Sequence, residues 1–277
     1  MESIMDAFNN SENAEPQPEV AKTKPSLFIR AGRGRTGGST GLDLVIQRAR
    51  FQGRRVKPLD GDRRSRTLST LYPSADEFGD PIEDGASFPV SDELPDIKEW
   101  LKGEFDDMVG EGVSRALDLS GGDRVMQEFV RDLALNEFCL HHGITPTVAL
   151  FLGPDIEDFR HATEILKSGE FPAERTILVL NEGVIRHGQT TEGAFLPIMM
   201  TREFDALTEA GVRTSFLRRL TCMSVLRERG VGFYEAAAGR TDKAGLKSSP
   251  TLAFMVKTWL AAFERDLDEG KVADWLP

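Results

Sequence analysis

Short apolar runs alternate with amphipathic segments along most of this chain, and that alternation limits the folds open to it. The apolar runs are typical of buried strands, and the segments between them have the 3.6-residue period of helices. The expected strands are residues 26–31, 54–60, 113–122, 145–154 and 174–183. The expected helices are residues 36–53, 94–109, 123–143, 155–169 and 250–270. We therefore predict an α/β fold, a mainly parallel sheet with helices on both faces, followed by a mostly helical part after about residue 200.

The first residues of the 277-residue chain differ in composition from the rest. Residues 1–24 are polar and lack periodicity, so we expect a disordered tail ahead of a single domain over residues 25–277. The acidic start is unlike a signal peptide and no apolar run is long enough to cross a membrane, which favours a cytoplasmic protein. Cys139 and Cys222 lie far apart in apolar stretches, and we expect both to be reduced and buried rather than metal ligands.

Charge is unevenly distributed along the chain. The formal net charge is −11, which argues against a generally nucleic-acid-binding surface. Residues 30–66 nevertheless hold eleven arginines and lysines against three acidic residues. A basic segment in an acidic protein suits a phosphate-binding site, and a solvated basic face is the alternative interpretation.

The basic segment contains a glycine-rich turn, AGRGRTGGST, at residues 31–40. Residues 32–39 fit the phosphate-loop pattern G-x-x-x-x-G-K-[ST], except that Gly38 occupies the lysine position. They also fit the dinucleotide pattern G-x-G-x-x-G, for which Asp60 would be the ribose-binding acid. Neither tyrosine starts a Tyr-x-x-x-Lys sequence, so the dinucleotide interpretation lacks an expected proton donor.

Polar residues follow several of the expected strands at their carboxyl ends, where ligands bind in parallel α/β sheets. They are the glycine turn itself, Asp60, Asp118 and Asn181. A phosphate loop requires carboxylates at these positions to complete a Mg²⁺ shell, whereas a dinucleotide enzyme does not. We therefore predict that Ser39, together with Asp60 or Asp118, holds Mg²⁺ and that Asp62 positions the attacking water if hydrolysis occurs.

The run RGRTGGSTGLDLVIQRARFQGRRVKPLDGDRRSRTLSTLY resembles the start of ParA/MinD-type ATPases, whose loop reads K-G-G-x-G-K-[ST]. The later LDLSGGD resembles their Walker B strand, and ILVLNEG resembles the strand whose asparagine, here Asn181, reads the base. The resemblance covers roughly residues 26–185 and, within the family, points to plasmid conjugal-transfer, mobilisation and stability homologues. It implies a P-loop NTPase-like fold, ATP and Mg²⁺ as ligands, a nucleotide-driven homodimer, plasmid partition or DNA-transfer proteins as partners, and indirect or non-specific contact with DNA.

The chain departs from that family at three positions of the loop. Arg33 stands where the family has its signature lysine, which reaches the nucleotide of a dimer partner. Arg35 replaces the second glycine, and Gly38 replaces the lysine that contacts the β- and γ-phosphates. Loss of that cation removes transition-state stabilisation, so we expect nucleotide binding with slow or absent hydrolysis, with Arg33 as the remaining catalytic cation.

These interpretations give one set of site residues and two rival functions. The expected nucleotide-binding residues are Gly34, Arg35, Thr36, Gly37, Gly38, Ser39, Thr40 and Asn181. The rivals to a weak ATPase are a pseudo-ATPase scaffold without nucleotide turnover and an NAD(P)-dependent oxidoreductase.

Overall fold

A computed structural model of the chain describes residues 24–62, 65–119, 123–169, 171–241 and 245–277. The expected tail at residues 1–24 lies almost wholly outside the described residues, as do the glycines expected to end the strand at 113–122. The described residues form one sheet of six parallel strands in the order β2-β3-β1-β4-β5-β6. The strands are β1 (Ser26–Ala31), β2 (Val56–Asp60), β3 (Ser114–Asp118), β4 (Thr145–Leu152), β5 (Thr176–Asn181) and β6 (Arg213–Leu217).

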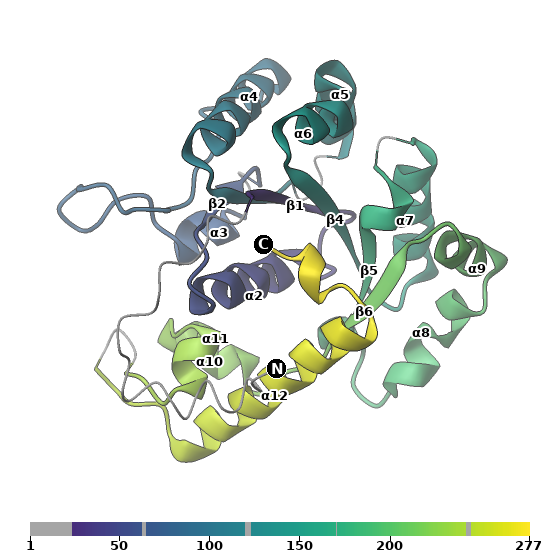
Figure 1. The fold of residues 1–277 in the computed structure, drawn as a ribbon. Coiled ribbons are helices and arrows are strands. Elements are labelled where there is room, and N and C mark those ends of the chain that lie inside the picture. Colours follow the sequence, from purple (N-terminus) through teal and green to yellow (C-terminus); the bar gives the residue numbers. More distant parts are fainter. Residues whose placement is uncertain (1–23, 63–64, 120–122, 170, 242–244) are drawn as a thin grey trace.

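Helices cover both faces of this sheet, as the alternation of patterns predicted (Figure 1). One face is covered by α4 (Leu94–Glu111), α5 (Asp123–Leu133), α6 (Leu135–His142), α7 (Ile156–Lys167), α8 (Thr191–Met199) and α9 (Arg202–Glu209). The other is covered by α2 (Gly38–Phe51), α3 (Thr67–Leu71), α10 (Met223–Arg229), α11 (Phe233–Ala237) and α12 (Pro250–Glu269). Three short 3-10 turns are η1 (Ala173–Arg175), η2 (Glu182–Val184) and η3 (Ala273–Trp275). The expected α/β class, a parallel sheet with helices on both faces, is confirmed.

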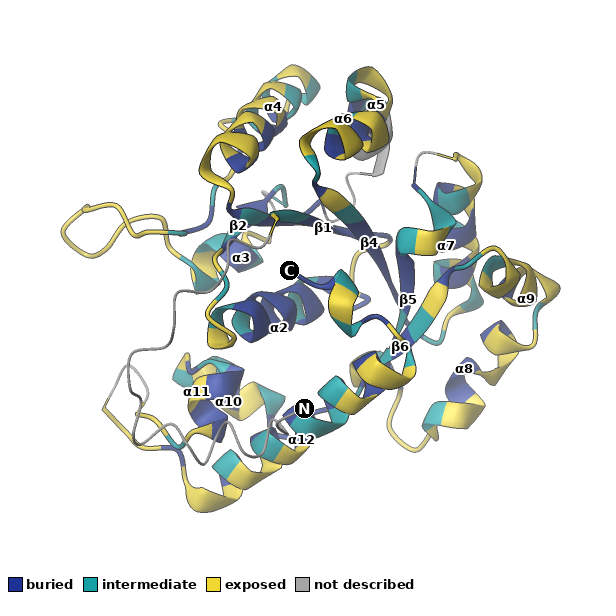
Figure 2. Cartoon of the chain, viewed as in Figure 1, coloured by how far each residue is buried: buried dark blue, intermediate teal, exposed yellow. Residues whose placement is uncertain are grey.

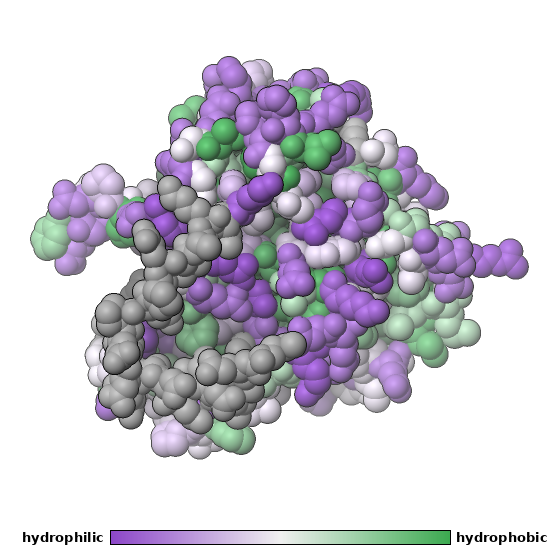
Figure 3. Space-filling model, viewed as in Figure 1, coloured by the Kyte–Doolittle hydropathy of each residue, from purple (hydrophilic) through white to green (hydrophobic). Residues whose placement is uncertain are grey.

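Each strand supplies side chains to two separate cores, because successive residues of a strand point to opposite faces. In β1, Leu27 and Ile29 pack under α4 to α9, whereas Phe28 packs against α2 and α12. Figure 2 shows the consequence, with the inner strands mostly buried and the outer faces of the helices exposed, whereas the edge strand β6 is only partly buried. Hydrophilic side chains cover much of the face shown in Figure 3.

Two parts of the fold differ from the sequence prediction. The mostly helical region after residue 200 contains β6, which adds a sixth strand beside β5. The single helix expected over residues 123–143 is two helices, because Ala134 has a left-handed backbone with φ 49° and separates α5 from α6. A left-handed residue cannot continue an α-helix, so the chain turns there.

Candidate functional site

The glycine-rich turn links the end of β1 to the start of α2, at the carboxyl edge of the sheet. Gly32, Arg35 and Gly37 have positive φ angles of 105°, 68° and 79°, and these left-handed residues turn the chain back toward the helix. Gly37 also has no room for a side chain, because a Cβ there would lie 2.1 Å from Asn181 Nδ2. The glycine at position 37 is therefore required both by its backbone angle and by its neighbour.

The start of α2 suits an anion. In the part of the chain that the structure describes, no side chain caps this helix and its first turn holds no acidic residue. The first N–H groups of a helix have no partners within the helix, and the helix dipole places partial positive charge there. A helix start of this kind after a glycine turn is the usual cradle for phosphate oxygens.

Ser39 and Asp118 meet beside that helix start. Asp118 ends β3, which lies next to β1 in the sheet, and Ser39 is in the first turn of α2. The Ser39 hydroxyl donates a hydrogen bond of 2.6 Å to Asp118 Oδ2. The structure thus brings together two of the three residues predicted to hold Mg²⁺.

Arg30 is a buried cation under the loop that was not among the predicted site residues. It lies near the end of β1 and is only 1% exposed. Its Nη1 pairs with Asp118 Oδ1 at 3.3 Å, and its Nη2 donates to the Arg33 carbonyl at 3.0 Å and to the Thr36 hydroxyl at 3.5 Å. Its Nε is buried and, among the described residues, has no hydrogen-bond partner. An arginine inside an apolar run was the available signal, since a charge buried there needs a specific role.

Asp60 lies at the carboxyl end of β2, as predicted, and is hydrogen-bonded within its own chain. Its Oδ2 accepts hydrogen bonds from the Ser69 backbone N–H at 2.7 Å and the Ser69 hydroxyl at 2.8 Å, and its Oδ1 accepts from the Asp62 N–H at 3.3 Å. Burial raises the pKa of Asp60, and the nearby Asp118 carboxylate adds to that rise. These hydrogen bonds connect α3 to the end of β2. The role of Asp60 as a metal ligand stays a prediction.

Asn181 is hydrogen-bonded to the backbone of the glycine-rich turn at Thr36. Asn181 ends β5 and is buried; its Nδ2 donates to the Thr36 carbonyl at 2.7 Å, and its Oδ1 accepts from the Gly183 N–H at 2.8 Å. Both ends of the amide are thus bonded to this chain. Contact with a base, the role the sequence suggested, remains a prediction.

The remaining predicted residues lie on the outer side of the loop. Arg33 is 47% exposed and pairs with Asp158 of α7, with 3.1 Å between its Nη1 and Oδ1. Gly34 and Arg35 are exposed, and Thr40 is half-buried in the first turn of α2. Asp62 accepts a hydrogen bond from the Ser65 N–H at 3.2 Å, and its water-positioning role is untested by this arrangement.

Metal binding by protein side chains alone is not indicated elsewhere. The described residues contain no group of three or more histidine, cysteine, aspartate or glutamate side chains that could hold a metal ion. Cys139 and Cys222 are free and buried, as expected, and burial raises the pKa of the Cys139 thiol to about 12. A Mg²⁺ ion at Ser39 and Asp118 would need phosphate oxygens and water to complete its shell, which is how Mg²⁺ usually binds.

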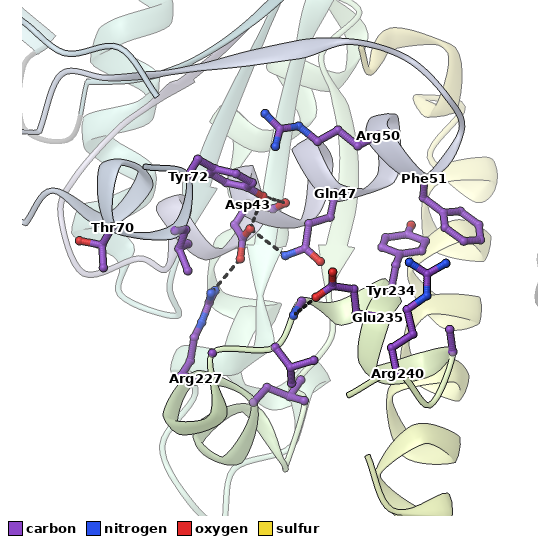
Figure 4. Close-up of a pocket in the computed structure, with 16 residues that line it drawn as sticks. Asp43, Gln47, Arg50, Phe51, Thr70, Tyr72, Arg227, Tyr234, Glu235 and Arg240 are labelled. Carbon is purple, nitrogen blue, oxygen red and sulfur yellow. Dashed lines mark hydrogen bonds and ion pairs between the residues drawn. The ribbon is translucent and has the colours of Figure 1, made fainter. Parts of the chain in front are cut away.

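A separate cavity of about 600 Å³ lies along the C-terminal half of α2, between that helix, α3, α10 and α11 (Figure 4). Asp43 lies at its wall and accepts hydrogen bonds from the Tyr72 hydroxyl at 2.6 Å, Gln47 Nε2 at 2.8 Å and Arg227 Nη1 at 2.8 Å. None of the residues predicted to bind nucleotide or metal lines this cavity. It is therefore distinct from the loop at the start of α2.

Of the comparisons with known proteins, only the one with solved structures finds matches. No family model matches the chain, and no curated protein matches it. Among solved structures, the chain is similar to chloroplast FtsY from Physcomitrella patens, with a TM-score of 0.44 and 12% sequence identity over 72% of this chain and 62% of that chain. This chain thus spans less than two thirds of the FtsY chain. No helix among the described residues has the length and apolar character needed to span a membrane.

Proposed function

We propose that this protein binds the phosphates of a nucleotide, together with Mg²⁺, at the loop between β1 and α2. The observation that carries the proposal is the 2.6 Å hydrogen bond from the Ser39 hydroxyl to Asp118 Oδ2 beside the uncapped start of α2. A hydroxyl in the first helical turn and a carboxylate on the neighbouring strand are the pair that holds Mg²⁺ in P-loop proteins.

Each part of the site has a role in this proposal. N–H groups at the start of α2 donate to phosphate oxygens, and the helix dipole favours their negative charge. Ser39 and Asp118 hold Mg²⁺, whose charge would offset that of the phosphates. The residues fit the ion, because an aliphatic hydroxyl and a carboxylate are oxygen ligands of the kind that Mg²⁺ prefers.

Hydrolysis is slow or absent in this proposal. Gly38 supplies no side chain at the position of the usual lysine, and Arg33 is engaged with Asp158 of its own chain. Stabilisation of charge in the transition state is worth several kcal/mol in comparable sites, on the order of 3 kcal/mol for one donor. The protein would therefore act as a nucleotide-dependent switch more than as a fast ATPase.

The cellular role belongs to the same proposal and rests on the sequence resemblance to ParA/MinD-type ATPases. That resemblance supports a role in plasmid partition, stability or conjugal transfer in the cytoplasm. It also supports a nucleotide-driven homodimer, with partition or DNA-transfer proteins as partners.

A scaffold that binds no nucleotide is the second candidate, and a specific observation favours it. Arg30 and Asn181 already bond to the inner side of the loop, so the loop is held without a ligand. An NAD(P)-dependent oxidoreductase is disfavoured, because β3 lies between β1 and β2. Asp60, at the end of β2, is therefore not on the strand next to the loop, where a ribose-binding acid is found.

Calorimetric titration of the purified protein with Mg²⁺–ATP, Mg²⁺–ADP and NAD(P) tests these functions, together with steady-state phosphate release. We expect binding of the Mg²⁺–nucleotides and turnover well below that of lysine-containing relatives. Failure to bind any of these ligands would reject the proposal in favour of the scaffold. Binding of NAD(P) alone would favour the oxidoreductase.

A further inference from the structure

The guanidinium of Arg30 fills the space that a side chain at position 38 would need. A Cβ on Gly38 would lie 1.9 Å from Arg30 Nε, 2.7 Å from its Cζ and 2.8 Å from its Nη2. Gly38 does not have the positive φ that requires glycine at position 37. The glycine at position 38 is therefore explained by the side chain of Arg30 and not by backbone geometry.

The contacts of Arg30 place a positive charge at the base of the phosphate loop. Its guanidinium touches the Asp118 carboxylate, the Arg33 carbonyl and the Thr36 hydroxyl. It thus reaches the loop backbone and the carboxylate that accepts the Ser39 hydroxyl. A lysine at position 38 and an arginine at position 30 would overlap, so the chain has room for only one cation here.

The hydrogen-bonding capacity of Arg30 is not fully used by the described residues. Its Nη1 pairs with Asp118, which also accepts the Ser39 hydroxyl. Its buried Nε has no acceptor among the described residues. A buried donor without an acceptor is unfavourable, and the start of α2 beside it carries partial positive charge. An anion at the loop would interact favourably with both groups.

We propose that Arg30, contributed by β1, replaces the missing lysine at position 38 as the cation that holds the nucleotide phosphates. This inference rests on the proposed function, since it assigns a phosphate-binding residue to the same loop. It explains two unusual residues together. Glycine at position 38 leaves space beside the loop, and the arginine of the first strand fills that space and supplies the positive charge.

Titration of Mg²⁺–ATP into wild type and the Arg30→Met variant tests the inference by affinity alone. Methionine keeps an unbranched apolar side chain of similar length and removes the charge. We expect affinity to fall about ten- to a hundredfold, the usual range for loss of a charge-assisted contact. Arg115→Met is the matched control: Arg115 is a fully buried arginine of β3, paired with Glu104 and Glu111 at the other end of the strand. It should lower stability without changing the affinity of the folded protein.

Two further variants keep the test decisive if Arg30→Met fails to fold. Arg30→Lys retains a positive charge with fewer donors, and it should bind Mg²⁺–ATP several-fold more weakly than wild type. The double variant Arg30→Ala/Gly38→Lys restores a lysine in the space that arginine leaves. It should bind more tightly than Arg30→Ala alone, whereas Gly38→Lys in the wild-type background should bind less tightly than wild type.

The outcomes separate this inference from the proposed function. Wild type that binds Mg²⁺–ATP while folded Arg30→Met or Arg30→Lys binds equally well, or more tightly, would overturn the role of Arg30 and leave the proposed function standing. Wild type that binds no nucleotide would overturn both.

Discussion

At the scale of single residues, two serines make the same contact at two places on the sheet edge. Ser39 donates to Asp118 at 2.6 Å beside the phosphate loop, and Ser69 donates to Asp60 at 2.8 Å in α3. Both serines are half-buried. Ser69 is therefore a matched control for the metal-binding role proposed for Ser39.

Ser39→Ala should lower the affinity for Mg²⁺–ATP about tenfold, equivalent to about 1.4 kcal/mol, because it removes one ligand of the metal shell. Its affinity for ATP in the presence of a chelator should stay at the wild-type value. Ser69→Ala should leave both affinities unchanged. Equal loss in the two variants, measured by calorimetry, would show that the Ser39 hydroxyl has only a structural role.

The sequence pattern anticipated that Ser39 and Asp118 lie close together, whereas their role as metal ligands stays a prediction. Asp118 and Ser39 were predicted together because a phosphate loop needs both, and the structure places them in contact. Arg30 was missed because it lies within the apolar run SLFIRA, where periodicity describes the strand and says nothing of a single charge. Its burial depends on Asp118, 88 residues later, a contact that the local pattern does not contain.

At the scale of elements, α2 is held by a buried carboxylate as well as by its apolar face. Asp43 is 1% exposed and joins α2 to the chain after α3, through Tyr72, and to α10, through Arg227. Gln47, one turn further along α2, completes the set of donors (Figure 4). Through these three hydrogen bonds, the Asp43 carboxylate connects α2 to α10 and to the residue that follows α3.

Asp43→Ala should lower the free energy of unfolding by about 3 kcal/mol, since it leaves three donors without their acceptor and removes the carboxylate partner of the half-buried Arg227. Tyr72→Phe removes a single hydrogen bond and should cost about 1 kcal/mol. Urea unfolding followed by circular dichroism measures both. A smaller loss for Asp43→Ala than for Tyr72→Phe would contradict this role of Asp43.

The raised pKa values of the two tyrosines predict how the free energy of unfolding changes at alkaline pH. Burial raises the pKa of Tyr72 well above 10.0, with the Asp43 carboxylate adding to the rise, and burial with the Glu264 carboxylate raises the pKa of Tyr234. Near pH 10 an unfolded tyrosine loses its hydroxyl proton, whereas the folded protein retains it. The two tyrosines therefore contribute fully to the free energy of unfolding below pH 10, and this contribution falls as the pH rises above 10. Tyrosinate absorbance should therefore appear only together with unfolding seen by circular dichroism. Absorbance rising near pH 10 with an unchanged circular dichroism spectrum would refute the burial of these hydroxyls.

The elements that sequence located best are those with long, clear periodicity. Five strands and the helices between them alternate in the order expected, since apolar runs and 3.6-residue patterns are set locally. The strand β6, Arg213–Leu217, is a short RTSFL segment among helices and forms by pairing with β5. The break at Ala134 falls inside a helical pattern and carries no glycine or proline to mark it.

At the scale of the whole molecule, strand order determines which residues meet. β3 inserts between β1 and β2, so Asp118 faces the phosphate loop and Asp60 lies one strand further away. Sequence alternation predicts a parallel sheet and cannot give this order. The topology therefore places Asp118, and not Asp60, on the strand next to the loop.

The loop at the start of α2 and the cavity along its C-terminal half are two different places where a ligand could bind. Hydrogen–deuterium exchange of the full chain, with and without saturating Mg²⁺–ATP, locates the site directly. We expect slower exchange in residues 34–40 and in the segment around Asp118, with little change in α10 and α11. Unchanged exchange in residues 34–40, or protection confined to the cavity residues around Tyr72 and Arg227, would contradict the central claim that this loop binds the nucleotide.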